Sequence, residues 1–311
     1  MNRYKFVDYA TQIYVLLVGS LVLCFHGARL SAWPWVLLGH AVVSGLIHLL
    51  IVAETRFPSQ RWLGFVRRFY PIPLYIAFYR ETELLNQMFN TGFWDAHFLR
   101  LEQKLFGMQP GLELMLRLPS RWIAEVLYAS YFSYYLMIAG IGLVLLLRDR
   151  RQFTHFVSVV SFVFYVCYTI YIFVPVVGPR IVHRETVAQP LPPDVVPAID
   201  LTPPATVEGA VFYRLMGWIY DHFEAAGAAF PSSHVAVAWC TVFFSFRYLR
   251  PIRYAHAIVA VLLSISTVYG RYHYVVDVIA GLAVAAVLVP LGNWLYFRLG
   301  ESANGAQTAR S

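Results

Sequence analysis

The feature that most constrains this chain is a series of apolar segments, each long enough to cross a lipid bilayer as a helix. A crossing helix needs about 20 mostly apolar residues. Of the 311 residues, 59% are hydrophobic and only 13% are charged, too few to cover a soluble domain with polar surface. We therefore predict an all-α fold, a polytopic transmembrane helix bundle. The predicted membrane helices are 9–28, 30–53, 122–147, 154–177, 232–248, 254–270 and 272–297.

Arginine clusters between these segments predict the membrane topology, because basic residues favour the cytoplasmic side. The clusters lie at 56–68, 148–151 and 247–253. Between the first two clusters the chain must cross an even number of times, yet 122–147 is the one obvious span there. A further crossing, kinked by Pro71 and Pro73, is therefore predicted at 63–80. The bundle then has about seven to eight membrane helices, with both termini in the cytoplasm.

This topology divides the chain into four regions. They are N-terminal membrane helices (1–80), an interfacial extracytoplasmic segment (81–121), a core (122–297) and a disordered cytoplasmic tail (298–311). Mixed apolar and charged residues predict that the interfacial segment contains a helix lying along the membrane surface, where it roofs a site. The second long extracytoplasmic connection, 178–230, is rich in proline, which predicts an extended or irregular lid.

Charge and cysteine content exclude several classes of protein. The net charge of +7 comes mostly from arginines beside apolar segments, which favours membrane topology over nucleic-acid binding. Cys24, Cys167 and Cys240 fall inside apolar segments without metal-ligand spacing, so we predict neither a disulfide framework nor a thiolate metal site. We expect the membrane as the chain's environment, no nucleic-acid partner and no cofactor.

Three polar sets fall on the extracytoplasmic side once the topology is drawn. Ionisable residues at the rim of a membrane bundle are costly and usually functional. The sets are Gly178-Pro179-Arg180, Pro231-Ser232-Ser233-His234 and Arg271-Tyr272-His273-Tyr274-Val275-Val276-Asp277.

The third set contains a candidate nucleophile. His273 and Asp277 are four residues apart, which places them on the same face of a helix, one turn apart. A hydrogen bond from one imidazole N–H to the carboxylate fixes the tautomer and leaves the other ring nitrogen free to attack phosphorus. For this pair alone, a purely structural hydrogen bond is the competing interpretation.

The other two sets supply candidate phosphate-binding groups and a proton donor. Ser232 and Ser233 begin a predicted helix whose N-terminus attracts anions, and His234 in its first turn can protonate a leaving alkoxide. The competing interpretation is that the serines only cap the helix and His234 reaches the interface. Arg180 can bind phosphate oxygens in a bidentate manner. Arg271 is equally a phosphate ligand or an interfacial anchor.

In this order, the three sets resemble the type-2 phosphatidic acid phosphatase superfamily of lipid phosphate phosphatases and phosphotransferases. The resemblance covers roughly residues 120–297 and implies a six-helix phosphatase-type core. It implies phosphate binding by Arg180, proton transfer by His234 and a nucleophilic pair of His273 and Asp277. Where the family commonly has an arginine, six residues before His273, this chain has Thr267. The third set is closer to the branch that includes the inositol phosphorylceramide synthases.

The function implied is that of a metal-independent membrane phosphoesterase with a phosphohistidine intermediate. It moves a phosphoryl or phospho-headgroup from a lipid phosphate or phospholipid to a polyol acceptor, as an inositolphosphotransferase does, or to water. A lipid phosphate or polyprenyl diphosphate phosphatase is the alternative within the family. Two other classes stay open: a lipid transporter or scramblase with polar residues along its pathway, and a metal hydrolase with His234, His273 and Asp277 as ligands.

Overall fold

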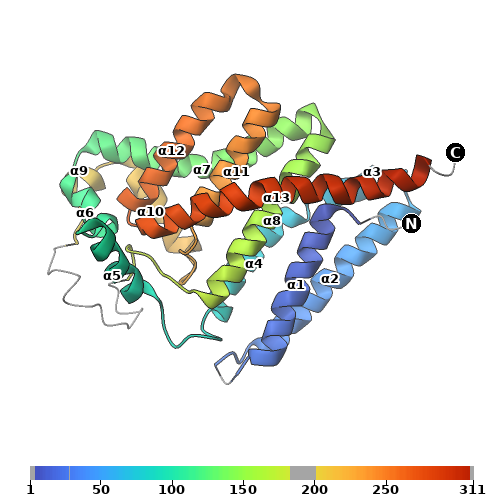
Figure 1. The fold of residues 1–311 in the computed structure, drawn as a ribbon, viewed down its shortest axis with the longest axis horizontal. Coiled ribbons are helices and arrows are strands. Elements are labelled where there is room, and N and C mark those ends of the chain that lie inside the picture. Colours follow the sequence, from blue (N-terminus) through green and yellow to red (C-terminus); the bar gives the residue numbers. More distant parts are fainter. Residues whose placement is uncertain (1–3, 28, 183–200, 309–311) are drawn as a thin grey trace.

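The structure, a computed structural model, describes residues 4–27, 29–182 and 201–308 and confirms the all-α helix bundle (Figure 1). Within these residues, six helices are long and apolar enough to cross a membrane. These are α1 (Phe6–Phe25), α2 (Trp33–Arg56), α7 (Arg121–Arg148), α8 (Arg150–Phe173), α12 (Arg253–Tyr269) with the short 3-10 helix Arg250–Ile252 before it, and the Val275–Leu299 part of α13 (Val275–Thr308).

The predicted span at 232–248 is shorter than a typical membrane helix. It forms α11 (Ser233–Tyr248), which has 16 residues, because Pro251 follows and the chain turns through the 3-10 helix before α12. α11 nevertheless packs against α7, α8, α12 and α13, so it belongs to the interior of the bundle.

Residues 63–80 do not form the single kinked helix that the sequence predicted. They are divided between α3 (Arg61–Phe69) and α4 (Pro71–Leu85), and the break falls at Tyr70. Pro71 and Pro73 cause this division, since proline is well suited to the first turn of a helix and disrupts an interior. α4 packs along α8.

A buried ion-pair network fixes α3 against the first two helices. The guanidinium of Arg67 pairs with Asp8 of α1 at 2.6 Å and with Glu54 of α2. Arg67 and Asp8 are both buried. Removing Arg67 would leave the buried carboxylate of Asp8 without its ion pair, which costs several kcal/mol.

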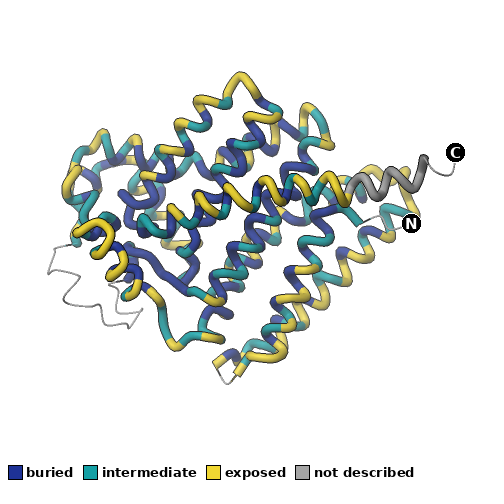
Figure 2. The backbone as a smooth tube through the Cα atoms, viewed as in Figure 1, coloured by how far each residue is buried: buried dark blue, intermediate teal, exposed yellow. Residues whose placement is uncertain are grey.

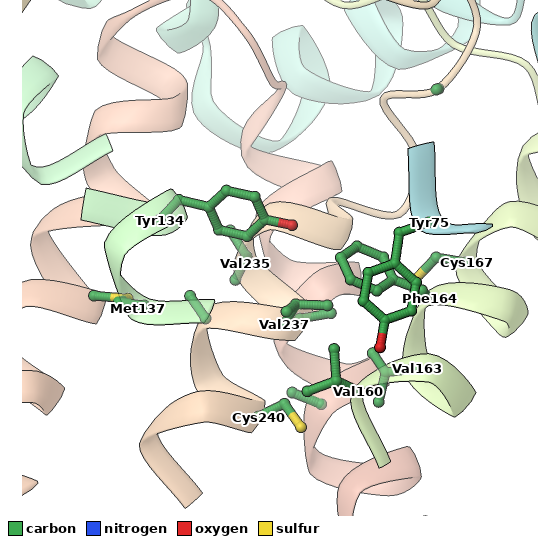
Figure 3. Close-up of a cluster of buried hydrophobic side chains, with 14 of the residues drawn as sticks. Tyr75, Tyr134, Met137, Val160, Val163, Phe164, Cys167, Val235, Val237 and Cys240 are labelled. Carbon is green, nitrogen blue, oxygen red and sulfur yellow. The ribbon is translucent and has the colours of Figure 1, made fainter. Parts of the chain in front are cut away.

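The core of the bundle forms around α8. Figure 3 shows one cluster of buried side chains. It includes Tyr75 of α4, Tyr134 of α7, Phe164 of α8 and Val237 of α11. Cys167 and Cys240 are buried in the same cluster, as their apolar surroundings in the sequence indicated. The outer side of α2 is exposed along its length (Figure 2), and its exposed side chains include apolar residues such as Leu46 and Leu49. Lipid covers such a face in a membrane protein.

Four short helices gather at the end of the bundle that lies opposite the two termini (Figure 1). They are α5 (Asp95–Phe106), α6 (Pro110–Arg117), α9 (Ala205–Glu208) and α10 (Val211–Phe223). Part of the predicted lid, 183–200, lies outside the described residues. Its described later part includes the helix α10, because α10 is free of proline and has apolar residues such as Phe212, Met216 and Tyr220 at helical spacing. Residues 201–204 and 224–230 lie outside helices.

The disorder predicted for the C-terminal tail, 298–311, stays a prediction, and residues 309–311 lie outside the described residues. The backbone of α13 continues as a helix beyond Arg298 to Thr308. The tail contains several good helix formers, including alanine, glutamate and glutamine, and it directly continues a long helix, so propagation needs no new nucleus.

Candidate active site

The turn after α8 brings the Gly178-Pro179-Arg180 set against the third set. Gly178 has a φ of 87°, a conformation that favours glycine, and a Cβ added to it would lie 2.5 Å from the carbonyl oxygen of Tyr272. Pro179 in turn faces Gly111 at the start of α6, where an added Cβ would lie 2.7 Å from the proline ring. Close backbone approach therefore fixes Arg180 beside the third set.

Arg180 lies where the sequence predicted, but its partners are carboxylates of the α10 region. Its guanidinium donates to Asp221 at 2.9 Å and to Glu224 at 3.0 Å. It also covers the rings of Tyr220 and Tyr272 at 5.3 and 5.6 Å. Burial alone would lower the pKa of Arg180, but Glu224 and the other nearby negative groups raise it overall. The arginine is fully charged and is neutralised by two side chains that the sequence did not single out.

The second set forms the capped N-terminus of α11, as predicted. The hydroxyl of Ser232 accepts a hydrogen bond from the N–H of Val235 at 3.3 Å. The N–H of Ser233 donates to the hydroxyl of Tyr171 at 3.2 Å. The N–H of Ser232 donates to the backbone carbonyl of Asp277 at 3.0 Å, so the second and third sets are joined directly.

The third set is a turn followed by a helix, and this corrects the predicted start of the helix at residue 272. α12 ends at Tyr269, and α13 begins at Val275, so His273 precedes the helix that carries Asp277. Arg271 reverses the chain with a φ of 65°, which is unusual for a residue with a side chain. The N–H groups of Tyr272 and His273 then both donate to the carbonyl of Thr267, at 2.9 and 3.1 Å.

Thr267, where the resemblance predicted an arginine, has a structural place inside α12. It is completely buried, and its hydroxyl donates to the carbonyl of Ser264 at 2.8 Å. Its own carbonyl supports the turn that carries His273. The side chain therefore supplies no positive charge to the site.

The three residues predicted to carry the chemistry lie together. Nε2 of His273 is 3.5 Å from Nδ1 of His234, and Nδ1 of His273 is 3.4 Å from Oδ2 of Asp277. Asp277 is completely buried, and the same Oδ2 accepts from the N–H of Tyr274 at 2.8 Å. Burial lowers the pKa of His273 well below its ordinary value, so its ring is neutral and has a lone pair to offer.

Aromatic rings enclose His234. Its imidazole lies 4.6 Å from the ring of Tyr134 and 5.4 Å from that of Tyr131, with Tyr220 of α10 further away at 6.5 Å. The centre of the Tyr220 ring in turn lies 4.1 Å from that of Tyr272, with the two rings tilted by 38°. His273 is buried, whereas His234 is partly exposed, and Tyr220 and Tyr272 lie between His234 and Arg180, which lines a neighbouring cavity.

That cavity has a volume of about 570 Å³ and is lined by both candidate arginines, Arg180 and Arg271, together with Arg214, Asp221 and Trp218. Arg271 is buried, and one of its guanidinium nitrogens donates to the carbonyl of Leu201. Arg271 therefore faces the interior of the protein and is not an anchor in the membrane interface. The cavity combines positive charge, a carboxylate and aromatic surface, which suits a polar, anionic molecule.

Two carboxylates that contact the predicted sets were missed by the sequence reasoning. Asp95 and Glu102 of α5 are completely buried, and between them they contact the first and third sets. Their seven-residue spacing puts them on one face of the helix, which is the signal that could have found them. Among the described residues, no group of three or more His, Cys, Asp or Glu side chains is arranged to hold a metal ion.

Comparison with known proteins gives two matches. A family model described as the PAP2 superfamily matches residues 96–291, which is more than half of the chain and includes all three sets. A PA-phosphatase related-family protein of Dictyostelium discoideum is 30% identical over 93 residues, which cover 29% of this chain and 16% of that protein. The matched region is thus a small part of that relative's length. No solved structure matches the chain.

Proposed function

Because this chain belongs to the PAP2 superfamily, we propose that it is a membrane lipid phosphoesterase whose nucleophile is His273. Family membership and the apolar helices support a multi-pass membrane protein with a lipid phosphatase-type function. We further propose a phosphohistidine intermediate and roles for His273, His234, Asp277 and Arg180.

The observation that carries the proposal is the arrangement around His273. One ring nitrogen faces the buried carboxylate of Asp277 at 3.4 Å, and the other faces His234 at 3.5 Å. A proton on Nδ1, directed at Asp277, leaves the lone pair of Nε2 facing the place where a phosphoryl group can enter. A second histidine at that place is within reach of the leaving oxygen.

In the first half-reaction, Nε2 of His273 attacks phosphorus. An N–P bond forms while the P–O bond to the leaving alcohol breaks, and His234 gives its proton to the departing oxygen. Asp277 stabilises the positive charge that develops on the imidazole. Arg180, after exchanging Asp221 and Glu224 for phosphoryl oxygens, neutralises the charge of the transferred group.

In the second half-reaction, His234 acts as a base. It removes a proton from an incoming hydroxyl, whose oxygen forms a new P–O bond as the N–P bond breaks and His273 is restored. Water as the acceptor gives a phosphatase, and an alcohol gives a phosphotransferase. None of the proton transfers in this scheme needs a metal ion.

The cavity beside the histidines favours an alcohol as the second substrate. Its volume of about 570 Å³ is larger than one water molecule needs, and it is lined by Asp221 and by aromatic and cationic side chains. A carboxylate can accept hydrogen bonds from the hydroxyls of a polyol, as in an inositolphosphotransferase-like reaction. The alternative is a lipid phosphate or polyprenyl diphosphate phosphatase, in which the cavity receives the headgroup of the substrate.

The site is also proposed to face the extracytoplasmic side of the membrane. The arginine clusters of the sequence favour a cytoplasmic location for the opposite end of the bundle, where both termini lie (Figure 1). This orientation can be tested by labelling single cysteines in α6 and in the α7–α8 connection with a membrane-impermeant reagent.

One experiment tests the function and separates the alternatives. Purified protein is incubated with a lipid labelled at its phosphate, with and without inositol, and the label is followed. Release as free phosphate indicates a phosphatase, and transfer to inositol indicates a phosphotransferase. Absence of turnover with both lipid phosphates and phospholipids would contradict the proposal and favour a lipid transporter.

A further inference from the structure

Helix α5 has an unusual distribution of side chains. Its two completely buried carboxylates, Asp95 and Glu102, lie on the same face as the buried Phe98 and Leu99. Leu105 in the last turn of the helix is 57% exposed. A helix that buries acids and exposes leucine has reversed the usual pattern of a soluble surface helix. Buried carboxylates need hydrogen-bond donors in the interior, and here those donors belong to the active-site sets.

Asp95 contacts both the Arg180 turn and the His273 turn. Its Oδ2 accepts from the N–H of Val177 at 3.0 Å. Its Oδ1 accepts from the N–H of Gly178 at 2.9 Å and from the hydroxyl of Tyr274 at 3.0 Å. One side chain thus connects the residues next to Arg180 with the residue next to His273.

Glu102 contacts the third set at a second point. Its Oε1 accepts from the N–H groups of Val275 and Val276, at 2.5 and 3.4 Å. These are the first two residues of α13, so Glu102 caps the helix that carries Asp277.

We propose that Asp95 and Glu102 are positioning residues, which hold the Arg180 turn and the His273 turn in the register that phosphoryl transfer needs. The inference rests on the proposed function. The hydrogen-bond partners of the two carboxylates are backbone N–H groups and the hydroxyl of Tyr274, and not the imidazole of His273 or the guanidinium of Arg180. Both act through the backbone and through Tyr274, and a shift of about 1 Å in such a framework can cost a hundredfold in rate.

The two carboxylates differ in how many of their oxygens accept hydrogen bonds. Asp95 uses both oxygens as acceptors, whereas an asparagine offers one oxygen and directs an N–H at a donor. Glu102 uses Oε1 alone, and a glutamine keeps an acceptor at that place. We therefore expect Asp95→Asn to disturb the site and Glu102→Gln to preserve much of it, with Glu102→Ala as the disruptive change at the second point.

The test measures kcat and KM of the purified full-length protein with dioctanoyl phosphatidic acid in detergent micelles. We expect kcat to fall at least about tenfold for Asp95→Asn and Glu102→Ala, with KM within about twofold of the wild-type value. Glu102→Gln, in contrast to Glu102→Ala, should keep kcat within about threefold of the wild-type value. Glu113→Gln is the matched control, because this α6 carboxylate binds Gln109 and Arg117 and contacts neither turn.

A double-mutant comparison separates positioning from general stability. If Asp95 acts through the Arg180 turn, the double variant Asp95→Asn/Arg180→Ala should lose less kcat than the two single variants predict. Its fold-loss should be smaller than the product of the two single fold-losses. Multiplicative losses would overturn the inference, and so would a fall in kcat that only follows the folded fraction. Tyr274→Phe supplies a second test should Asp95→Asn fold poorly. It removes one donor to Asp95, and an unchanged kcat would likewise count against the proposal.

The failure of the inference can be told apart from failure of the proposed function. Absence of turnover by the wild-type protein would overturn the proposed function. Normal turnover by wild type together with full kcat in Asp95→Asn would overturn the positioning role alone.

Discussion

Nε2 of His273 lies 3.5 Å from Nδ1 of His234, although the two residues are 39 positions apart in the chain. The contact forms because the turn before α13 and the first turn of α11 are bound together, with the N–H of Ser232 donating to the carbonyl of Asp277. The two rings lie closer together than a bound phosphoryl group allows. We therefore interpret this arrangement as the resting site, which opens when the substrate enters.

Asp277→Asn should lower kcat by about 10²- to 10⁴-fold while the protein stays folded. The amide lacks the negative charge that Oδ2 of Asp277 directs at Nδ1 of His273, so it cannot stabilise the developing imidazolium, and a comparable change in a catalytic triad has an effect of this size. Initial rates over a range of lipid concentrations measure the effect. Asp149→Asn is the matched control, because asparagine also caps α8 and Asp149 lies outside the site. A kcat within threefold of wild type would speak against a catalytic Asp277.

Glu224→Gln should lower KM by about two- to fivefold, because Glu224 competes with the substrate phosphate for the guanidinium of Arg180. The amide keeps the size of the side chain but removes its charge. The change is measured as the lipid concentration at half-maximal rate, at low ionic strength. Glu83→Gln, on the last turns of α4 and paired with Arg80, is the control for a lost surface charge. A raised KM would show that Glu224 supports substrate binding.

Gly178→Ala should destabilise the fold by about 2 kcal/mol or more, because alanine disfavours the φ of 87° and its Cβ would lie 2.5 Å from the carbonyl oxygen of Tyr272. The melting temperature in detergent micelles measures this cost. Gly140→Ala in α7 is the matched control, since no atom lies within 4 Å of an added Cβ there. Equal melting temperatures for the two variants would contradict the close approach of the two turns.

Glu102 should make stability depend on pH. Burial first, and then the charge of Asp277, raises the pKa of Glu102 from 4.5 to about 7. Because the folded protein disfavours the ionised carboxylate, this group lowers stability progressively as pH rises from about 4.5 to about 7, and the loss is complete above that. Glu102→Gln lacks this loss.

The advantage in stability of Glu102→Gln over wild type should therefore be small near pH 4.5 and largest above pH 7, on the order of 3 kcal/mol. Melting curves of both proteins across this range measure it. Other titrating groups are common to the two proteins and cancel in the difference. A difference that does not change with pH would show that Glu102 keeps an ordinary pKa.

The long apolar segments predicted the membrane helices well because the thickness of a bilayer imposes both length and composition. The three polar sets could also be located, since a charged residue at the rim of a bundle stands out in a sequence this apolar. His273, His234 and Asp277 indeed lie together, and Arg180 lies over the ring of Tyr272, the residue before His273.

The carboxylates of α5 and α10 could not be predicted in the same way. The spacing of Asp95 and Glu102 marks one face of a helix, but Leu101 and Leu105 mark another, and periodicity alone does not say which face is inside. Side-chain polarity alone would predict that the leucines face the interior. The carboxylates face it instead, because the N–H groups of Gly178 and Val275 donate to them. Similarly, the prolines before α10 led to the prediction of an irregular segment. The contact of Arg180 with Glu224, just after α10, joins residues that are remote in the sequence.

The most direct test of the central claim is to trap the intermediate on His273. Purified protein is mixed with dioctanoyl phosphatidic acid labelled at its phosphate, quenched within a turnover and assayed for protein-bound label that is stable to base and lost in acid. We predict such label on the peptide that contains His273 in the wild-type protein and none in His273→Ala. Normal lipid turnover by His273→Ala would contradict the account.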